Sequence, residues 1–140
     1  MSTRSLVRFA KREEGVSFSE HPERVEVQVY KHYDGYPSGH PVDLAEFLKD
    51  FKVVNGLGQD TYKVANGVGC LAAQYVAALK MDAGELYIEN VDTEHFDIEY
   101  VTYVWGTENK DIWMSIFDIE DGCIFVGKPQ ELIEKYEDND

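Results

Sequence analysis

One segment, Arg24-Val-Glu-Val-Gln-Val-Tyr-Lys-His-Tyr33, alternates apolar and polar side chains more regularly than any other part of the chain. A period of two is typical of a β-strand that buries one of its faces. We therefore expect Val25, Val27 and Val29 to point into the core. The opposite face is expected to carry Glu26, Gln28, Tyr30 and His32.

An earlier strand is expected at Thr3–Arg12, where Val7 and Phe9 share one face. Its other face carries Arg4, Leu6, Arg8 and Arg12. If this strand pairs antiparallel with Arg24–Tyr33, the arginines share a face with the polar side chains of that segment. Charge pairs and hydrogen bonds can then join the two strands.

Helical periodicity follows the second strand. Pro41–Lys52 predicts an amphipathic helix, because its large apolar residues recur at helical spacing. A second helix is expected near Asn66–Met81; its residues are small and apolar nearly all round, which favours a buried position. Four strands and a last helix are expected at Glu85–Asn90, Glu99–Gly106, Ile112–Ile119, Cys123–Val126 and Pro129–Tyr136.

These elements define the expected fold class. The order β-β-α-α-β-β-β-β-α lacks the regular alternation of strands and helices, and so predicts an α+β fold. We expect a largely antiparallel sheet with the helices packed on one face. The length of 140 residues suits one domain over residues 1–140, with an acidic tail that frays at about residues 137–140.

The acidity of the chain is concentrated in its second half. Residues 1–70 carry 9 Lys or Arg against 10 Asp or Glu, and residues 71–140 carry 4 against 17, which gives the net charge of −14. A field of this sign repels nucleic acid and anionic membranes, so direct binding to either is not expected. Either the acidic surface is simply solvated, or it imitates a phosphate backbone and occupies a nucleic-acid-binding protein.

Other features of the chain favour a cytoplasmic protein. No apolar run approaches the length of about 20 residues that a membrane helix needs, and the first residues lack the apolar block of a signal peptide. Cys70 and Cys123 are expected to be buried, reduced thiols. No cofactor is expected, and self-association stays open.

The junction Tyr30-Lys-His-Tyr-Asp-Gly-Tyr-Pro-Ser-Gly-His40 joins the second strand to the first helix. A turn and a helix cap account for its Asp, Gly, Pro and Ser residues. They do not account for its histidines and tyrosines, which could present a recognition surface to a protein partner, together with the neighbouring Arg/Gln/Tyr/His strand face. The candidate binding residues are His32, Tyr33, Asp34, Tyr36 and His40.

Two other uses of the junction stay open. His32, Asp34, His40 and Asp43 could hold a divalent metal, although their spacing matches no specific metal motif. The alternative hypothesis is a small metal-dependent or acid–base enzyme centred on His32, Asp34 and His40, although no nucleophile with a partnered base stands out. The leading hypothesis is a non-enzymatic binding protein.

Two motifs in the first third of the chain carry a resemblance. Thr3-Arg-Ser5 opens the first strand, and His32-Tyr-Asp-Gly-Tyr-Pro37 ends the second. This pair resembles a group of small uncharacterised proteins of phages and microbial genomes, which share an N-terminal Thr-Arg-Ser and a His-aromatic-Asp-Gly-Tyr-Pro segment. Tyr33 stands where tryptophan is usual in that group. The resemblance implies a small accessory protein carried by mobile elements, and it implies no mechanism.

Overall fold

A computed structural model describes residues 3–12, 17–22, 24–54, 64–81, 83–107 and 109–137. These residues form eight strands and three helices. In chain order they are β1 (Arg4–Lys11), β2 (Arg24–Lys31), α1 (His40–Leu48), β3 (Lys52–Val54), β4 (Val64–Asn66), α2 (Gly67–Leu79), β5 (Leu86–Glu89), β6 (Ile98–Gly106), β7 (Ile112–Asp118), β8 (Gly122–Gly127) and α3 (Pro129–Tyr136). The end of the predicted acidic tail, residues 138–140, lies outside the described residues.

The α+β class is confirmed, but the predicted order of elements is incomplete because it lacks β3 and β4. Each of these strands has only 3 residues, too few for an alternation to be visible in the sequence. They pair in parallel with each other and form a separate two-stranded sheet. The helix predicted over Pro41–Lys52 consequently ends at Leu48, and Lys52 begins β3.

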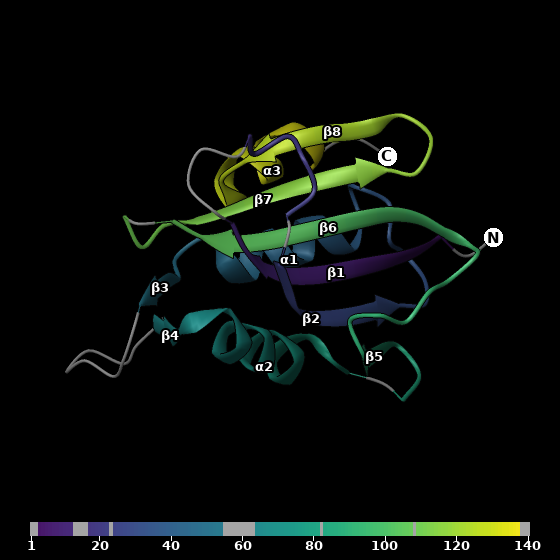
Figure 1. The fold of residues 1–140 in the computed structure, drawn as a ribbon, viewed down its shortest axis with the longest axis horizontal. Helices are drawn as coiled ribbons and strands as arrows, with labels where there is room; N and C mark the ends of the chain where they lie inside the picture. The colour runs from purple at the N-terminus through teal and green to yellow at the C-terminus, as the bar shows by residue number, and fades with distance from the viewer. Residues whose placement is uncertain are drawn as a thin grey trace.

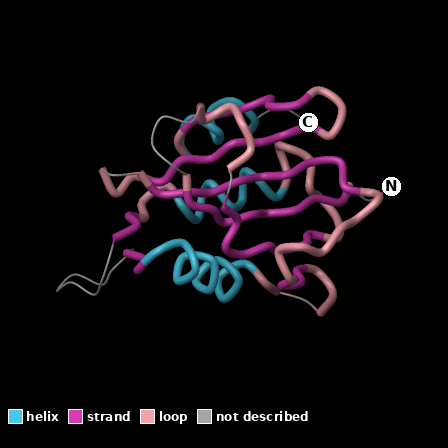
Figure 2. Tube along the Cα trace, viewed as in Figure 1, coloured by secondary structure: helices cyan, strands magenta, loops and turns pink. Residues whose placement is uncertain are grey.

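The main sheet has six strands in the order β5-β2-β1-β6-β7-β8, and Figure 1 shows this order across the molecule. The sheet is mostly antiparallel, as predicted, but mixed, because β1 and β6 pair in parallel. This pairing follows from the connection between β5 and β6. Residues 90–97, here called the crossover, contain no helix or strand and carry the chain past β2 and β1 (Figure 2).

One core cluster unites the sheet with the helices. Figure 1 shows α1 behind the middle of the sheet and α3 behind β7 and β8, with α2 toward the β2 side. Val7 and Phe9 of β1 belong to this cluster, as predicted. The helices contribute Leu44, Leu48, Leu71, Tyr75 and Leu132, all at most 1% exposed.

Val25 does not lie on the face of the sheet that was predicted for it. Val29 is buried in the main core and Val27 packs against it, whereas Val25 packs in a second cluster with Ala10, Tyr103 and Trp105. The reason is a register shift, since Phe9 faces Val27 but Ala10 faces Val25. A bulge of one residue reverses the side-chain alternation beyond it. We call the face with this second cluster the outer face of the sheet.

The second predicted helix is not buried all round. Val68, Leu71, Ala72 and Tyr75 are the buried residues of α2, while Cys70 is exposed. The expectation of a buried thiol is therefore wrong for Cys70, and Cys123 is only half-buried; both are free. Small side chains expose little apolar area, so one side of this helix can face solvent at low cost.

Replacing Gly35 by alanine is expected to destabilise the fold by about 1–3 kcal/mol, because a methyl group there has no room. It would overlap the Ser5 side chain and lie 3.0 Å from the Thr3 carbonyl oxygen. The matched control is Gly69→Ala in α2, where nothing lies within 4 Å. That variant should gain about 0.5–1 kcal/mol from helix propensity. Urea unfolding measures both, and equal effects would contradict the prediction.

Candidate functional site

The junction after β2 is a tight turn held by backbone hydrogen bonds. Asp34 has a φ of 59°, a left-handed conformation that aspartate tolerates better than most residues. Its carbonyl oxygen accepts the His40 N–H at 2.8 Å, and the Tyr36 carbonyl accepts the Gly39 N–H at 2.8 Å. Gly35 donates its N–H to the Thr3 carbonyl at 2.9 Å. The backbone conformation and hydrogen bonds of this turn are therefore sufficient to explain the aspartate at position 34.

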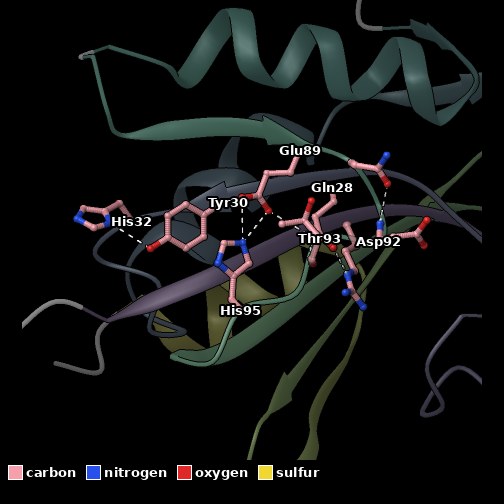
Figure 3. A network of polar contacts seen from close by, with 9 residues as sticks. Gln28, Tyr30, His32, Glu89, Asp92, Thr93 and His95 are labelled. Atoms are coloured by element: carbon pink, nitrogen blue, oxygen red, sulfur yellow. Dashed lines mark hydrogen bonds and ion pairs between the residues drawn. The ribbon is translucent and has the colours of Figure 1, made fainter.

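The other predicted binding residues point to different places. His32 lies on the outer face, where its Nδ1 is 3.0 Å from the Tyr30 hydroxyl (Figure 3). Tyr36 is 42% exposed at the turn. His40 is only 4% exposed, and its Nε2 makes a short hydrogen bond with the Tyr75 hydroxyl of α2. The structure thus separates His32 from His40.

His40 and Tyr75 are a neutral buried pair. Burial, reinforced by the positive charge of Lys31, lowers the pKa of His40 to about 3. Burial, followed by the negative charge of Glu85, raises the pKa of Tyr75 above its ordinary value. At neutral pH both groups are uncharged and bonded to each other, which suits a structural role better than proton transfer.

Tyr33 contacts a buried ion pair, Lys31 with Glu85, that lies beside this histidine. The Lys31 ammonium lies 3.5 Å from a Glu85 carboxylate oxygen, and their side chains are 6% and 12% exposed. The Tyr33 ring lies under that ammonium at 4.4 Å, and its hydroxyl donates to Glu85 Oε2 at 3.4 Å. Lys31, Glu85 and His40 line one side of a shallow hollow between α1 and the end of α2.

The carboxylates of α1 complete that hollow. Asp43 and Glu46 line it. Burial is the main cause that raises the pKa of Asp43; the Lys31 charge lowers this pKa, and the charges of Asp34 and Glu46 raise it further. Within the described ranges, no group of three or more His, Cys, Asp or Glu side chains is placed to hold a metal ion. The set His32, Asp34, His40 and Asp43 is therefore not brought together as one metal site.

A chain of polar contacts runs over the outer face (Figure 3). Arg8 donates from Nε to Gln28 Oε1 at 2.8 Å, and Gln28 donates from Nε2 to Glu89 Oε1 at 3.0 Å. Both Glu89 oxygens lie within 2.9 Å of His95 Nε2. The His95 ring stacks on Tyr30 with centroids 4.5 Å apart.

This network ties the crossover to the strands. Gln28 is fully buried and also donates to the Thr93 carbonyl oxygen at 3.1 Å, while His95 covers Tyr30. The Arg/Gln/Tyr/His strand face that was predicted to meet a partner thus contacts the chain's own crossover. Arg8, Tyr30 and His32 remain partly exposed, and the crossover and the neighbouring edge strand β5 carry the most exposed side chains of this region.

Sequence reasoning missed these two segments as candidates. We call residues 85–97 the acidic edge, because they contain five Asp or Glu and no Lys or Arg. Of the six large apolar side chains exposed among the described residues, three lie here: Tyr87 at 48%, Ile88 at 69% and Phe96 at 102% exposure. The available signal was that no Lys or Arg occurs between Lys80 and Lys110.

Three acidic side chains of this edge have partners within the described chain. Glu85 forms an ion pair with Lys31 and Asp97 one with Arg4 at 2.7 Å, while Glu89 is hydrogen-bonded by His95 and Gln28. Asp92 and Glu94 are exposed, and no ion pair joins either to another part of the described chain. These two carboxylates lie on the same crossover as Phe96.

Comparison of the chain with protein-family models, curated proteins and solved structures gave no match. Among the described helices, none combines the length and apolar character needed to cross a membrane. The class defined by the fold is thus an α+β protein with a mixed six-stranded sheet.

Proposed function

We propose that the protein is a non-enzymatic binding protein that takes a basic protein partner on its acidic edge. One observation carries this proposal: exposed Tyr87, Ile88 and Phe96 lie on the same segment as the exposed carboxylates of Asp92 and Glu94, and that segment contains no Lys or Arg. Exposed apolar and aromatic side chains among charges of one sign are typical of interaction surfaces. Carboxylates steer a partner of opposite charge and penalise wrong partners.

The sharper form of this proposal concerns what the partner does. A basic patch that fits this edge is what nucleic-acid-binding proteins use to contact phosphates. An acidic accessory protein can occupy such a patch and so inhibit the partner. The resemblance of the first third to phage and microbial proteins makes a mobile element the setting that we propose for this inhibition.

Peptide selection tests the proposal without assuming a partner. Random twelve-residue peptides displayed on phage are selected on the purified protein, and the tightest binders are made synthetically. We expect the selected sequences to combine Lys or Arg with apolar residues. Their affinity should fall about tenfold between low and high salt, because exposed charges are screened. Selection of peptides without basic residues would overturn the proposal.

A charge-matched pair of variants locates the binding. Asp92→Asn with Glu94→Gln removes two carboxylates from the crossover, and Glu120→Gln with Asp121→Asn removes two exposed ones from the turn between β7 and β8. The first pair should weaken peptide binding several-fold and the second should leave it nearly unchanged. Equal losses would show that only the overall charge matters and that the acidic edge is not the site.

A further inference from the structure

One side of β5 is an open edge of the main sheet. β5 is the outermost strand of the main sheet on that side, and its four residues pair with β2 in the register Gln28–Glu89 to Lys31–Leu86. An edge strand keeps one row of backbone N–H and C=O groups that its own sheet does not use. Such a row can accept another strand by hydrogen bonding.

The register identifies which groups face outward. The Glu85 carbonyl oxygen accepts the His32 N–H at 3.3 Å, so this pair marks the hydrogen-bonded positions of the antiparallel ladder. Because the pattern repeats every two residues, the backbone N–H and C=O groups of Tyr87 and Glu89 point toward β2. Leu86 and Ile88 turn their backbone groups to the open side.

A side-chain contact supports this assignment of the outward-facing backbone groups. The Lys80 ammonium donates to the Leu86 carbonyl oxygen at 2.9 Å, so that outward carbonyl is already in use. Ile88 is the next outward position, and its side chain is 69% exposed. Natural edge strands are usually protected by lysine, proline or a bulge within the strand. The sequence Leu86-Tyr-Ile-Glu89 contains no lysine or proline, and its pairing with β2 has no register shift.

Charge decides between the possible occupants of this edge. A second copy of the chain, paired edge to edge about Ile88, would place the acidic edge of each copy against that of the other. Each copy also carries a net charge of −14. Like charges across an interface oppose association, whereas a basic segment gains from the same carboxylates.

We infer that an extended basic segment of the partner adds to the sheet as a strand beside β5, through the backbone N–H and C=O of Ile88. This inference rests on the proposed function and names its mode of binding. Backbone hydrogen bonds supply the pairing, and alternate side chains of the added strand meet the apolar and the acidic groups of the edge. A segment that alternates basic and apolar residues has the chemistry that fits.

Amide hydrogen exchange tests the pairing directly. The probe is the tightest basic peptide from the display selection, added to the isotopically labelled, full-length protein. Exchange of the Ile88 amide should slow at least about tenfold on peptide binding, because its hydrogen becomes bonded. The amides of Tyr87 and Glu89, which already face β2, should change much less. Unchanged exchange at Ile88 in the saturated complex would overturn the inference.

A pair of variants separates the backbone from the side chain. Ile88→Pro removes the outward N–H at a position where an edge strand tolerates proline, and should weaken the peptide at least about tenfold. Ile88→Thr retains the N–H and a β-branched side chain, and should retain most of the binding. Circular dichroism checks that both variants fold. If Ile88→Pro does not fold, the exchange of the Ile88 amide in the wild-type complex decides whether strand addition occurs.

The possible failures are distinguishable. If no basic peptide binds, the proposed function itself is wrong. If a basic peptide binds equally to the wild type and to Ile88→Pro, without protection of the Ile88 amide, strand addition is wrong and the proposed function stands. If sedimentation shows a dimer that the same variant dissociates, the occupant is a second copy, which also overturns the inference.

Discussion

Lowering the pH from 7 to 4 is expected to destabilise the protein by about 3 kcal/mol through His40 alone. His40 is 4% exposed, and burial with the nearby Lys31 charge lowers its pKa to about 3. In the unfolded chain its pKa returns to the ordinary value of about 6.5. Between these two values the unfolded state binds one more proton than the folded state, so the free energy of unfolding falls as the pH falls.

Urea unfolding at pH 7, 5.5 and 4 measures this effect when the wild type is compared with His40→Leu/Tyr75→Phe. The double variant removes both partners of the hydrogen bond, so neither polar group is left buried alone. The raised pKa of Asp43 acts in the opposite direction and is retained in both proteins. We expect the wild type to lose about 3 kcal/mol more than the variant over this range. Parallel pH profiles would contradict the prediction.

Replacing Glu85 by glutamine is expected to cost about 3–5 kcal/mol, because it removes the carboxylate that pairs directly with the buried Lys31 ammonium. The two charges are 3.5 Å apart, and the lysine side chain is only 6% exposed. The ring of Tyr33 at 4.4 Å can compensate only a fraction of that charge. Urea unfolding at pH 7 measures the loss.

Two comparisons make this test sharp. Glu46→Gln removes the same charge from the pair of Glu46 with Lys49, whose side chains are 43% and 39% exposed, and should cost less than about 1 kcal/mol. Lys31→Met with Glu85→Leu removes both buried charges and should lie much closer to the wild type than Glu85→Gln does. A Glu85→Gln protein as stable as Glu46→Gln would refute the buried-pair account.

The candidate site was only partly predictable. The turn at Asp34-Gly35 and the hairpin at Gly122 follow from local backbone preferences, which a short stretch of sequence contains. That His32 and His40 face different surroundings was not predictable, because it depends on Tyr75, thirty-five residues after His40. The role of the crossover was missed for the same kind of reason. Irregular segments have no periodicity that shows what they cover.

The sequence by itself determined the α+β class, the positions of the long strands and helices, and the core side of Val7, Phe9 and Val29. Periods of 2 and 3.6 residues are local properties, and burial of one face maintains them. Only the tertiary structure decided that β6 lies parallel beside β1, that a bulge moves Val25 to the outer face, and that β5 ends the sheet. These features depend on contacts between residues far apart in the chain, and the exposed acidic edge results from them.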